Sequence, residues 1–195
     1  MVKVAILGFG VVGSGVAEVL SGNGAGIQKK ADELIEVKYI LDVRDFPDSP
    51  FAQHFVKDFS VIEHDPEVNV VVETIGGVGA ALDFTERALK QGKSVVTSNK
   101  ELVATHGRRL LDLAAQNNAV YLFEASVGGG IPILRPLSEC MSANEILEIC
   151  GILNGTANYI FTRMVKDHVP FAEALAGAQA NGYAEQDPTA DVDGH

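Results

Sequence analysis

A glycine motif near the N-terminus has the spacing that binds a dinucleotide. Gly8, Gly10 and Gly13 stand at Gly-x-Gly-x-x-Gly spacing, after a short apolar run and at the start of a helical pattern. The first glycine permits a tight turn, the second lets the backbone approach a pyrophosphate, and the third lets helix and strand pack closely. The N–H groups and the dipole at the helix N-terminus favour bound phosphate. The motif therefore predicts an NAD or NADP site formed by Gly8, Phe9, Gly10, Val11, Val12 and Gly13.

The choice between the two dinucleotides depends on four residues further along the chain, Asp42-Val43-Arg44-Asp45. An acidic side chain at the end of the second strand bonds the ribose hydroxyls of NAD, whereas a nearby arginine suits the additional phosphate of NADP. Both residue types are present here. Arg44 slightly favours NADP, while Asp42 or Asp45 would repel its phosphate, so use of both dinucleotides stays open.

The pattern of apolar residues predicts the elements that must position these side chains. Short apolar runs alternate with segments of helical spacing. Strands separated by helices of this length form βαβ units with a parallel sheet and right-handed crossovers. We therefore expect an α/β fold, a Rossmann-type doubly wound parallel sheet. The strands are expected at 2–7, 37–41, 68–72, 94–97 and 119–123, the helices at 11–20, 80–91 and 101–116, and a flexible connection at 21–26.

The pattern changes near Ser126, where a triglycine segment precedes Pro132. We place a domain boundary at residue 130, with a dinucleotide-binding Rossmann domain over 1–130 and a partial α+β substrate and dimerisation domain over 131–195. The second part is short for an independent domain. Within it we expect a helix to about residue 141, a strand at 146–153, helices at 156–168 and 170–181, and a loop at 182–195.

Composition narrows the class of protein. The 195 residues have a formal net charge of −11, which argues against nucleic acid as a partner because phosphate binding needs a clustered basic surface. No apolar run approaches the ~20 residues that a membrane helix needs, and the N-terminus does not resemble a signal peptide. The histidines lack ligand spacing, and the two cysteines are expected to be reduced, mostly buried thiols. We expect a cytoplasmic, enzyme-like domain with no membrane partner and no transition metal.

Several further motifs follow the glycine motif in a fixed order. They are Val72-Glu73-Thr74-Ile75-Gly76-Gly77, Ser98-Asn99-Lys100, Glu124-Ala125-Ser126-Val127-Gly128-Gly129-Gly130-Ile131-Pro132, Gly151-Ile152-Leu153-Asn154-Gly155-Thr156 and Gly182-Tyr183-Ala184-Glu185-Gln186-Asp187-Pro188. Together they make the whole chain resemble the homoserine dehydrogenases. The glycine motif is shared by many dehydrogenases, whereas the last three motifs at these spacings are close to diagnostic. The resemblance implies reduction of L-aspartate 4-semialdehyde to L-homoserine with NAD(P)H, on the route to threonine, methionine and isoleucine.

The resemblance also implies roles for single residues. Hydride transfer to an aldehyde builds negative charge on oxygen, so a cationic or proton-donating group must lie close to it. Lys100, at the carboxyl end of the fourth predicted strand, is implied to be catalytic. The carboxylates of Glu185 and Asp191 suit the ammonium group of the substrate. In full, cofactor contacts are implied for Thr74, Ser98, Lys100 and Gly182, and substrate contacts for Thr156, Tyr183, Glu185 and Asp191.

Two interpretations of the glycine-rich segment after the fifth predicted strand stay open. A triglycine loop can cradle an anion. The resemblance implies instead a monovalent cation, sodium, held by the region of Glu124 and by the carbonyl oxygens of Val127, Gly129 and Ile131. A hydrolase nucleophile at Ser126 is not expected, because the Gly-x-Ser-x-Gly motif is absent and no histidine-bearing motif accompanies it.

The chain departs from the family pattern at its C-terminal end. The pattern continues with an aspartate that touches substrate and, four residues later, a second lysine regarded as the proton donor, and both positions lie past His195. We expect a homo-oligomer for the full-length enzyme, and weak or no turnover from this chain alone. Two functions therefore compete: an oxidoreductase, or a fragment of one, and a non-catalytic dinucleotide-binding module.

Overall fold

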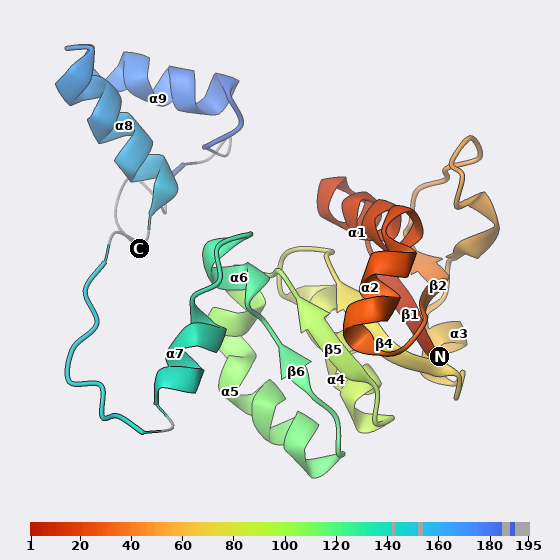
Figure 1. The fold of residues 1–195 in the computed structure, drawn as a ribbon. Helices are drawn as coiled ribbons and strands as arrows, with labels where there is room; N and C mark the ends of the chain where they lie inside the picture. The colour runs from red at the N-terminus through yellow and green to blue at the C-terminus, as the bar shows by residue number, and fades with distance from the viewer. Residues whose placement is uncertain (142, 152–153, 185–187, 190–195) are drawn as a thin grey trace. The chain divides into compact units, whose positions relative to one another are not determined.

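The computed structural model describes residues 1–141, 143–151, 154–184 and 188–189. The chain divides into two compact units, Met1–Ser142 and Ala143–His195, and each is described by itself. The first unit holds a parallel sheet with helices on both faces, and the described part of the second holds helices α8 and α9 (Figure 1). The functional boundary at residue 130 stays a prediction.

The sheet of the first unit confirms the expected α/β class. Its six strands pair in parallel in the order β3-β2-β1-β4-β5-β6. Each strand predicted for residues 1–130 is present, and the short edge strand β3 is an addition. The bounds are β1 Val2–Leu7, β2 Ile35–Leu41, β3 Phe55–Val56, β4 Val68–Glu73, β5 Ser94–Thr97 and β6 Tyr121–Leu122.

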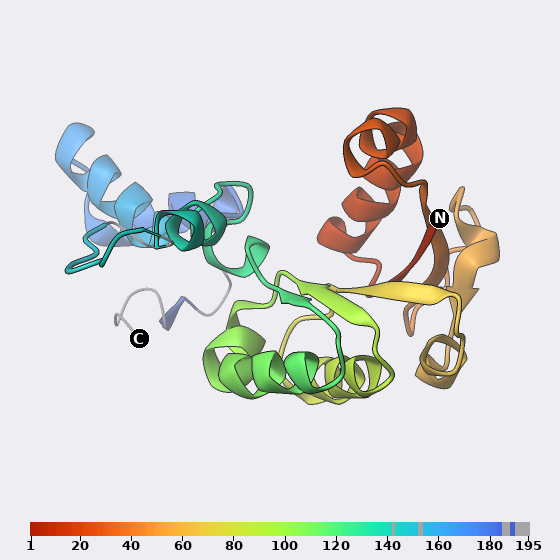
Figure 2. The same cartoon turned by 60° about the horizontal axis from the view of Figure 1, so that its bottom comes forward.

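The helices of the first unit lie on both faces of this sheet. Figure 2 shows α1 and α2 on one face and α4 and α5 on the other. The helix bounds are α1 Val11–Gly22, α2 Gly24–Ala31, α3 Phe59–Glu63, α4 Gly79–Lys90, α5 Lys100–Gln116, α6 Ala125–Gly128 and α7 Leu134–Cys140, with a 3-10 turn at Ala52–His54.

Strand β1 is buried on both sides because its side chains alternate between two apolar cores. Ala5 and Leu7 pack in the larger core with side chains from α3, α4 and α5, whereas Val4 and Ile6 pack against Ala17 of α1. Successive side chains of a strand point to opposite faces, so an unbroken apolar run is what a central parallel strand requires. The run Val2–Leu7 therefore places the end of β1 firmly inside the unit.

The second unit contains a pair of packed helices, α8 (Gly155–Lys166) and α9 (Phe171–Ala180). Asn154 caps α8, because its Oδ1 accepts a hydrogen bond of 2.8 Å from the N–H of Ala157. The facing side chains of the two helices form a small core that includes Ile160, Ala174 and Ala178. The two helices predicted for this segment are confirmed.

Three sequence expectations are wrong. Residues 24–31 form α2 instead of continuing the flexible connection predicted at 21–26. No strand forms in the described residues 146–151 of the segment predicted as 146–153, where Leu147 is 89% and Ile149 is 67% exposed. The side chains of this segment find no buried surface, so its apolar residues do not produce a strand. Cys140 and Cys150 are exposed thiols, because they lie at the end of α7 and in that irregular segment.

Candidate dinucleotide-binding and catalytic site

The glycine motif lies at the point where the strand order of the sheet reverses. β1 pairs with β2 on one side and with β4 on the other. The loop that begins at Gly8 is joined to both neighbours, because the N–H of Gly8 donates to the Leu41 carbonyl (2.8 Å) and the N–H of Thr74 donates to the Leu7 carbonyl (2.9 Å). In open α/β sheets, the crevice at the carboxyl ends of strands flanking such a point is where ligands bind.

Each glycine of the motif has the geometry that its predicted role needs. Gly8 has a φ of +91°, which disfavours any other residue. A Cβ on Gly13 would lie 1.9 Å from the Gly8 carbonyl oxygen, so only glycine lets α1 approach β1 this closely. A Cβ on Gly10 would meet nothing within 4 Å, so open space lies beside its backbone. Gly8 thus forms the turn, Gly10 leaves the backbone open to approach, and Gly13 allows the close packing of α1 on β1.

The N-terminus of α1 presents backbone donors without a side-chain cap. Gly10 is the N-cap residue, and the first turn contains no acidic side chain. The first N–H groups of a helix have no intrahelical acceptor, and they favour an anion. Val11 is 92% exposed and Val12 is 51% exposed at the same helix end. The start of α1 therefore presents backbone donors beside exposed apolar side chains, whereas Gly13 behind it is buried.

The side chain of Thr74 is hydrogen-bonded to this loop. Its hydroxyl lies 2.9 Å from the Leu7 carbonyl oxygen and 3.0 Å from the Gly8 carbonyl oxygen. The same oxygen would lie 2.8 Å from a Cβ on Gly13. The side chain of Thr74 is thus engaged with the loop itself, and a cofactor contact by Thr74 stays a prediction.

The residues that were expected to select the dinucleotide are joined to each other. Asp42 is buried at the end of β2, and its Oδ2 accepts from the N–H of Phe9 (2.7 Å) and from Nη2 of Arg44 (2.9 Å). Its Oδ1 accepts from Nε (3.1 Å) and the backbone N–H (2.8 Å) of Arg44. These bonds, above all those from the Arg44 guanidinium, hold the pKa of Asp42 well below its usual range. Each carboxylate oxygen already accepts two hydrogen bonds.

Arg44 remains largely exposed although it is held in place. Its side chain is 59% exposed, and its guanidinium lies 5.1 Å from the ring centroid of Phe46. The Phe46 ring stacks on Phe55 at 5.1 Å, and the Phe9 ring meets both edge-on. Nζ of Lys57 donates to the carbonyl of Arg44 at 2.6 Å. An oriented cation therefore lies beside the loop that follows β1.

Lys100 is the first residue of α5, directly after the capping residue Asn99. Its side chain is exposed, and Ser98 before it is partly buried. A lysine is unfavourable at a helix N-terminus, because the helix dipole disfavours positive charge there. The folding of α5 therefore does not explain a lysine at this position, and a catalytic role for Lys100 stays a prediction.

A chain of hydrogen bonds joins the ends of β4 and β5 near Lys100. Glu73 is fully buried, and its carboxyl group accepts from the N–H of Ile75 (2.8 Å) and the hydroxyl of Thr97 (2.5 Å). Oγ1 of Thr97 accepts from the N–H of Asn99 at 2.9 Å. Asn99 then donates through Nδ2 to the Gly77 carbonyl at 2.6 Å.

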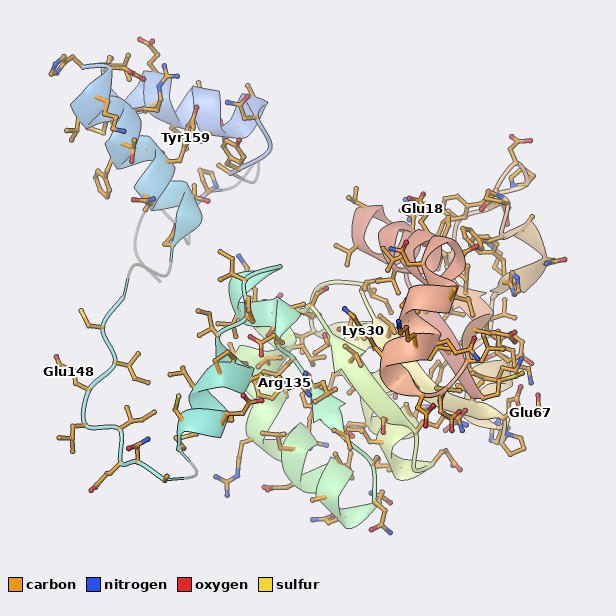
Figure 3. The ribbon with its side chains drawn as sticks, viewed as in Figure 1. Glu18, Lys30, Glu67, Arg135, Glu148 and Tyr159 are labelled. Carbon is orange, nitrogen blue, oxygen red and sulfur yellow. The ribbon has the colours of Figure 1, made fainter. Side chains whose placement is uncertain are left out.

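Glu124 lies where it stabilises α7. Its Oε1 accepts from the N–H groups of Ile133 (2.5 Å) and Leu134 (2.9 Å), and its Oε2 accepts from the N–H of Arg135 (2.8 Å). These backbone donors lower the pKa of Glu124. Arg135 is labelled on α7 in Figure 3. The side chain of Glu124 therefore stabilises the start of α7, and the cation site expected at this segment stays a prediction.

Two of the predicted substrate residues lie together in the second unit. Thr156, at the start of α8, donates its hydroxyl to the carbonyl of Tyr183 at 2.7 Å. The Tyr183 ring lies 5.0 Å from that of Tyr159, which Figure 3 labels on α8. Gly182, directly before Tyr183 in the chain, has a φ of +73°. Glu185 and Asp191 lie outside the described residues.

Several residues that shape the site have contacts that the sequence does not predict. Asp42 is expected from the sequence to bind the ribose or to repel the NADP phosphate, and the sequence predicts no role for Glu73, Thr97 or Lys57. Asn99 could have been found, because asparagine directly before a helical pattern is a common N-cap. Its Oδ1 accepts the N–H of Leu102 at 3.0 Å. The buried acid at the end of β4 has no comparable local sequence pattern.

The part of the chain that the structure describes contains no group of three or more His, Cys, Asp and Glu side chains that could hold a metal ion. Among the same residues, no helix is long and apolar enough to cross a membrane.

The fold and the glycine loop together define a dinucleotide-binding Rossmann domain of the dehydrogenase type. The family model described as "Homoserine dehydrogenase, NAD binding domain" matches residues 8–124, and the model "Homoserine dehydrogenase" matches residues 132–195. The chain therefore belongs to the homoserine dehydrogenase family.

Individual relatives agree with this assignment. The homoserine dehydrogenase of Lactococcus lactis is 42% identical, over 99% of this chain and 46% of its own length. A homoserine dehydrogenase structure from Thiobacillus denitrificans is 37% identical with a TM-score of 0.87, over 97% of this chain and 44% of that one. A hyperthermophilic archaeal homoserine dehydrogenase in complex with NADPH is 27% identical with a TM-score of 0.80, over 99% and 65%. The chain thus spans less than half the length of the curated relative.

Proposed function

We propose that this chain binds NADPH or NADH at the end of β1 and takes part in the interconversion of L-aspartate 4-semialdehyde and L-homoserine. The single observation that supports this most is the separation of roles among Gly8, Gly10 and Gly13 at the reversal of the strand order. The family membership of both parts of the chain points to the same reaction.

The chemistry follows from the residues at the ends of the strands. A bound reduced nicotinamide would supply a hydride to the aldehyde carbon, and the aldehyde oxygen takes up a proton to become the hydroxyl of homoserine. The N–H groups at the start of α1 bind the pyrophosphate, with Gly10 leaving room for it. Lys100 stabilises the negative charge that develops on the aldehyde oxygen.

Substrate recognition is proposed for the second unit. Thr156 and Tyr183 lie together there, and Glu185 and Asp191 follow in sequence. Carboxylates bind an ammonium group through charge-assisted hydrogen bonds, so the two acids suit the amino group of the substrate. Cofactor contacts by Ser98, Thr74 and Gly182 complete the proposal.

An assay of NADPH oxidation with aspartate semialdehyde tests this function directly. Turnover that requires both substrates, and that Lys100→Ala removes, supports a homoserine dehydrogenase. Binding of NADPH without turnover supports the second candidate, a non-catalytic dinucleotide-binding module. This candidate is favoured by the glycine loop, whose uncapped helix N-terminus and open space beside Gly10 both lie within the first unit. A chain that binds neither dinucleotide contradicts both.

We also propose a preference for NADPH over NADH. The Asp42 carboxylate accepts two hydrogen bonds on each oxygen, so it has little capacity left for ribose hydroxyls. Arg44 is oriented and exposed, and a guanidinium is well suited to bind phosphate. We therefore expect Arg44 to favour NADPH more strongly than Asp42 favours NADH.

Replacing Arg44 by alanine is expected to weaken NADPH binding by roughly 10- to 100-fold, because hydrogen bonds to charged groups contribute ~1.5–3 kcal/mol. NADH binding should stay the same or improve, since the substitution frees the acceptor atoms of Asp42. Fluorescence titrations with both dinucleotides measure the two affinities. Arg108→Ala, which removes an exposed guanidinium from α5, is the matched control. An unchanged ratio of the NADPH and NADH affinities would contradict the proposed preference.

A sodium ion, if bound, would use the carbonyl oxygens of Val127, Gly129 and Ile131, which are hard donors. The side chain of Glu124 would support this site indirectly. Its oxygens accept three N–H groups at the start of α7 and so hold the backbone that follows the glycine-rich segment. We also propose that the full-length enzyme is a homo-oligomer.

A further inference from the structure

The carboxyl group of Glu73 is an unusual component of an apolar core. It is fully buried at the end of β4, on the face of the sheet that carries the larger core. A buried polar group destabilises a fold unless its hydrogen bonds are satisfied, and a buried charge does so more strongly. Its two partners, the N–H of Ile75 and the hydroxyl of Thr97, come from two different strand ends.

The bond to Thr97 is the first of several that lead to the start of α5. The proton of the Thr97 hydroxyl goes to Glu73, which leaves the lone pairs of Oγ1 to accept the N–H of Asn99. A hydroxyl can donate only one hydrogen bond, so an acceptor at position 73 determines how Oγ1 faces residue 99.

Asn99 passes this constraint on to the helix and to the neighbouring loop. Its Oδ1 caps the N–H of Leu102, and its Nδ2 donates to the Gly77 carbonyl. The residue between the cap and Leu102 on the first turn is Lys100, followed by Glu101. The direction in which the backbone leaves β5, and with it the position of Lys100, is thus fixed at three hydrogen bonds.

The core contains a second polar group near Glu73. The hydroxyl of Tyr121 is buried and has no hydrogen-bond partner among the described residues. Burial raises the pKa of this phenol, and the charge of Glu73 raises it further. Apolar side chains at these positions would avoid both burial penalties. Stability alone therefore does not account for an acid at position 73.

We propose that the buried carboxyl group of Glu73 positions Lys100, acting through the side chain of Thr97. This inference rests on the proposed catalytic role of Lys100. Glu73 contacts neither cofactor nor substrate in this account, so it is a positioning residue and not a catalytic one.

Three substitutions in the 195-residue chain test the inference. Thr97→Val keeps the shape of the side chain but removes both of its hydrogen bonds, whereas Thr97→Ser keeps the hydroxyl and is the matched control. Glu73→Gln keeps an acceptor for Ile75 but replaces the acceptor of the Thr97 proton by a donor. It provides a second probe if Thr97→Val does not fold.

Two measurements are made on each variant. The first is kinetic and gives kcat for semialdehyde reduction, together with the dissociation constant for NADPH. The second is the NMR signal of the Lys100 amine after ¹³C-methylation of lysines, assigned with Lys100→Arg. We expect Thr97→Val and Glu73→Gln to lower kcat by about 10- to 100-fold, as displaced catalytic groups do, with NADPH affinity within about twofold. The Lys100 resonance should shift in both variants and stay in place in Thr97→Ser.

The outcomes separate this inference from the proposed function. An unsubstituted chain without turnover counts against the proposed function, and the Lys100 resonance then decides the inference by itself. If that resonance is unmoved in both Thr97→Val and Glu73→Gln, the inference is wrong. A loss of kcat that only follows the loss of folded protein, or that is equal in Thr97→Ser, also overturns it.

Discussion

Replacing Lys100 by alanine is expected to lower kcat for semialdehyde reduction by about 10²- to 10⁴-fold, the range typical for removal of a group that handles charge or protons in the transition state. NADPH binding should change much less than kcat, because the donors at the start of α1 and the Arg44 cation are untouched. Stopped-flow or steady-state measurement of NADPH oxidation gives kcat, and a fluorescence titration gives the dissociation constant.

The position of Lys100 makes this substitution unusually clean. Lysine at the first position of α5 opposes the helix dipole, and alanine is a better helix former, so the variant should be no less stable than the parent. Lys90→Ala, which removes an exposed lysine from the end of α4, is the control for a general loss of positive charge. Activity within threefold of the parent in Lys100→Ala would remove this lysine from the mechanism.

The second large effect is expected in the glycine loop. Substitution of Gly13 should lower stability, whereas substitution of Gly10 should lower NADPH affinity. Gly13→Ala places a Cβ 1.9 Å from the backbone oxygen of Gly8, and 2.8 Å from the Thr74 hydroxyl. The contact is with backbone, so α1 must move away from β1. Overpacking of this kind typically destabilises by ~1–3 kcal/mol or more. A drop in the thermal unfolding midpoint is the measurement.

Gly10→Ala should instead leave the fold intact and remove the cofactor. Its φ of −82° suits any residue, and an added Cβ meets nothing within 4 Å. The space that the methyl group would enter is the space proposed for the pyrophosphate. We expect NADPH affinity to fall by at least about tenfold, ~1.4 kcal/mol. Gly15→Ala, one turn along α1 with an equally open Cβ position, is the control. Full affinity in Gly10→Ala would place the phosphates elsewhere.

Much of the fold could be predicted because its determinants are local and periodic. The run Val2–Leu7 is apolar on both faces at every position except Lys3, so a central parallel strand is the expected structure. The predicted helix at 11–20 is followed by glycines, which led to a flexible connection, yet Gly24–Ala31 is helical. Glycine disfavours a helix by only ~1 kcal/mol, which is too little for Gly24 and Gly26 to exclude a helix there.

The site was less predictable, because several of its contacts join residues far apart in sequence. Gly8, Gly10 and Gly13 are recognised from spacing, and their neighbours Leu41 and Thr74 are found only in the fold. The bond from the Phe9 N–H to Asp42, and the bond from Thr97 to Glu73, join separate strand ends. Sequence spacing carries no information on such pairs.

The exposed valines at the start of α1 give the proposed binding reaction a calorimetric signature. Val11 and Val12 are 92% and 51% exposed. A dinucleotide lying along this helix end would remove both side chains from water. Burial of apolar surface lowers the heat capacity, so the enthalpy of binding must become more favourable as the temperature rises. The temperature dependence of the affinity of this loop for its ligand would then be more strongly curved than phosphate contacts alone would dictate.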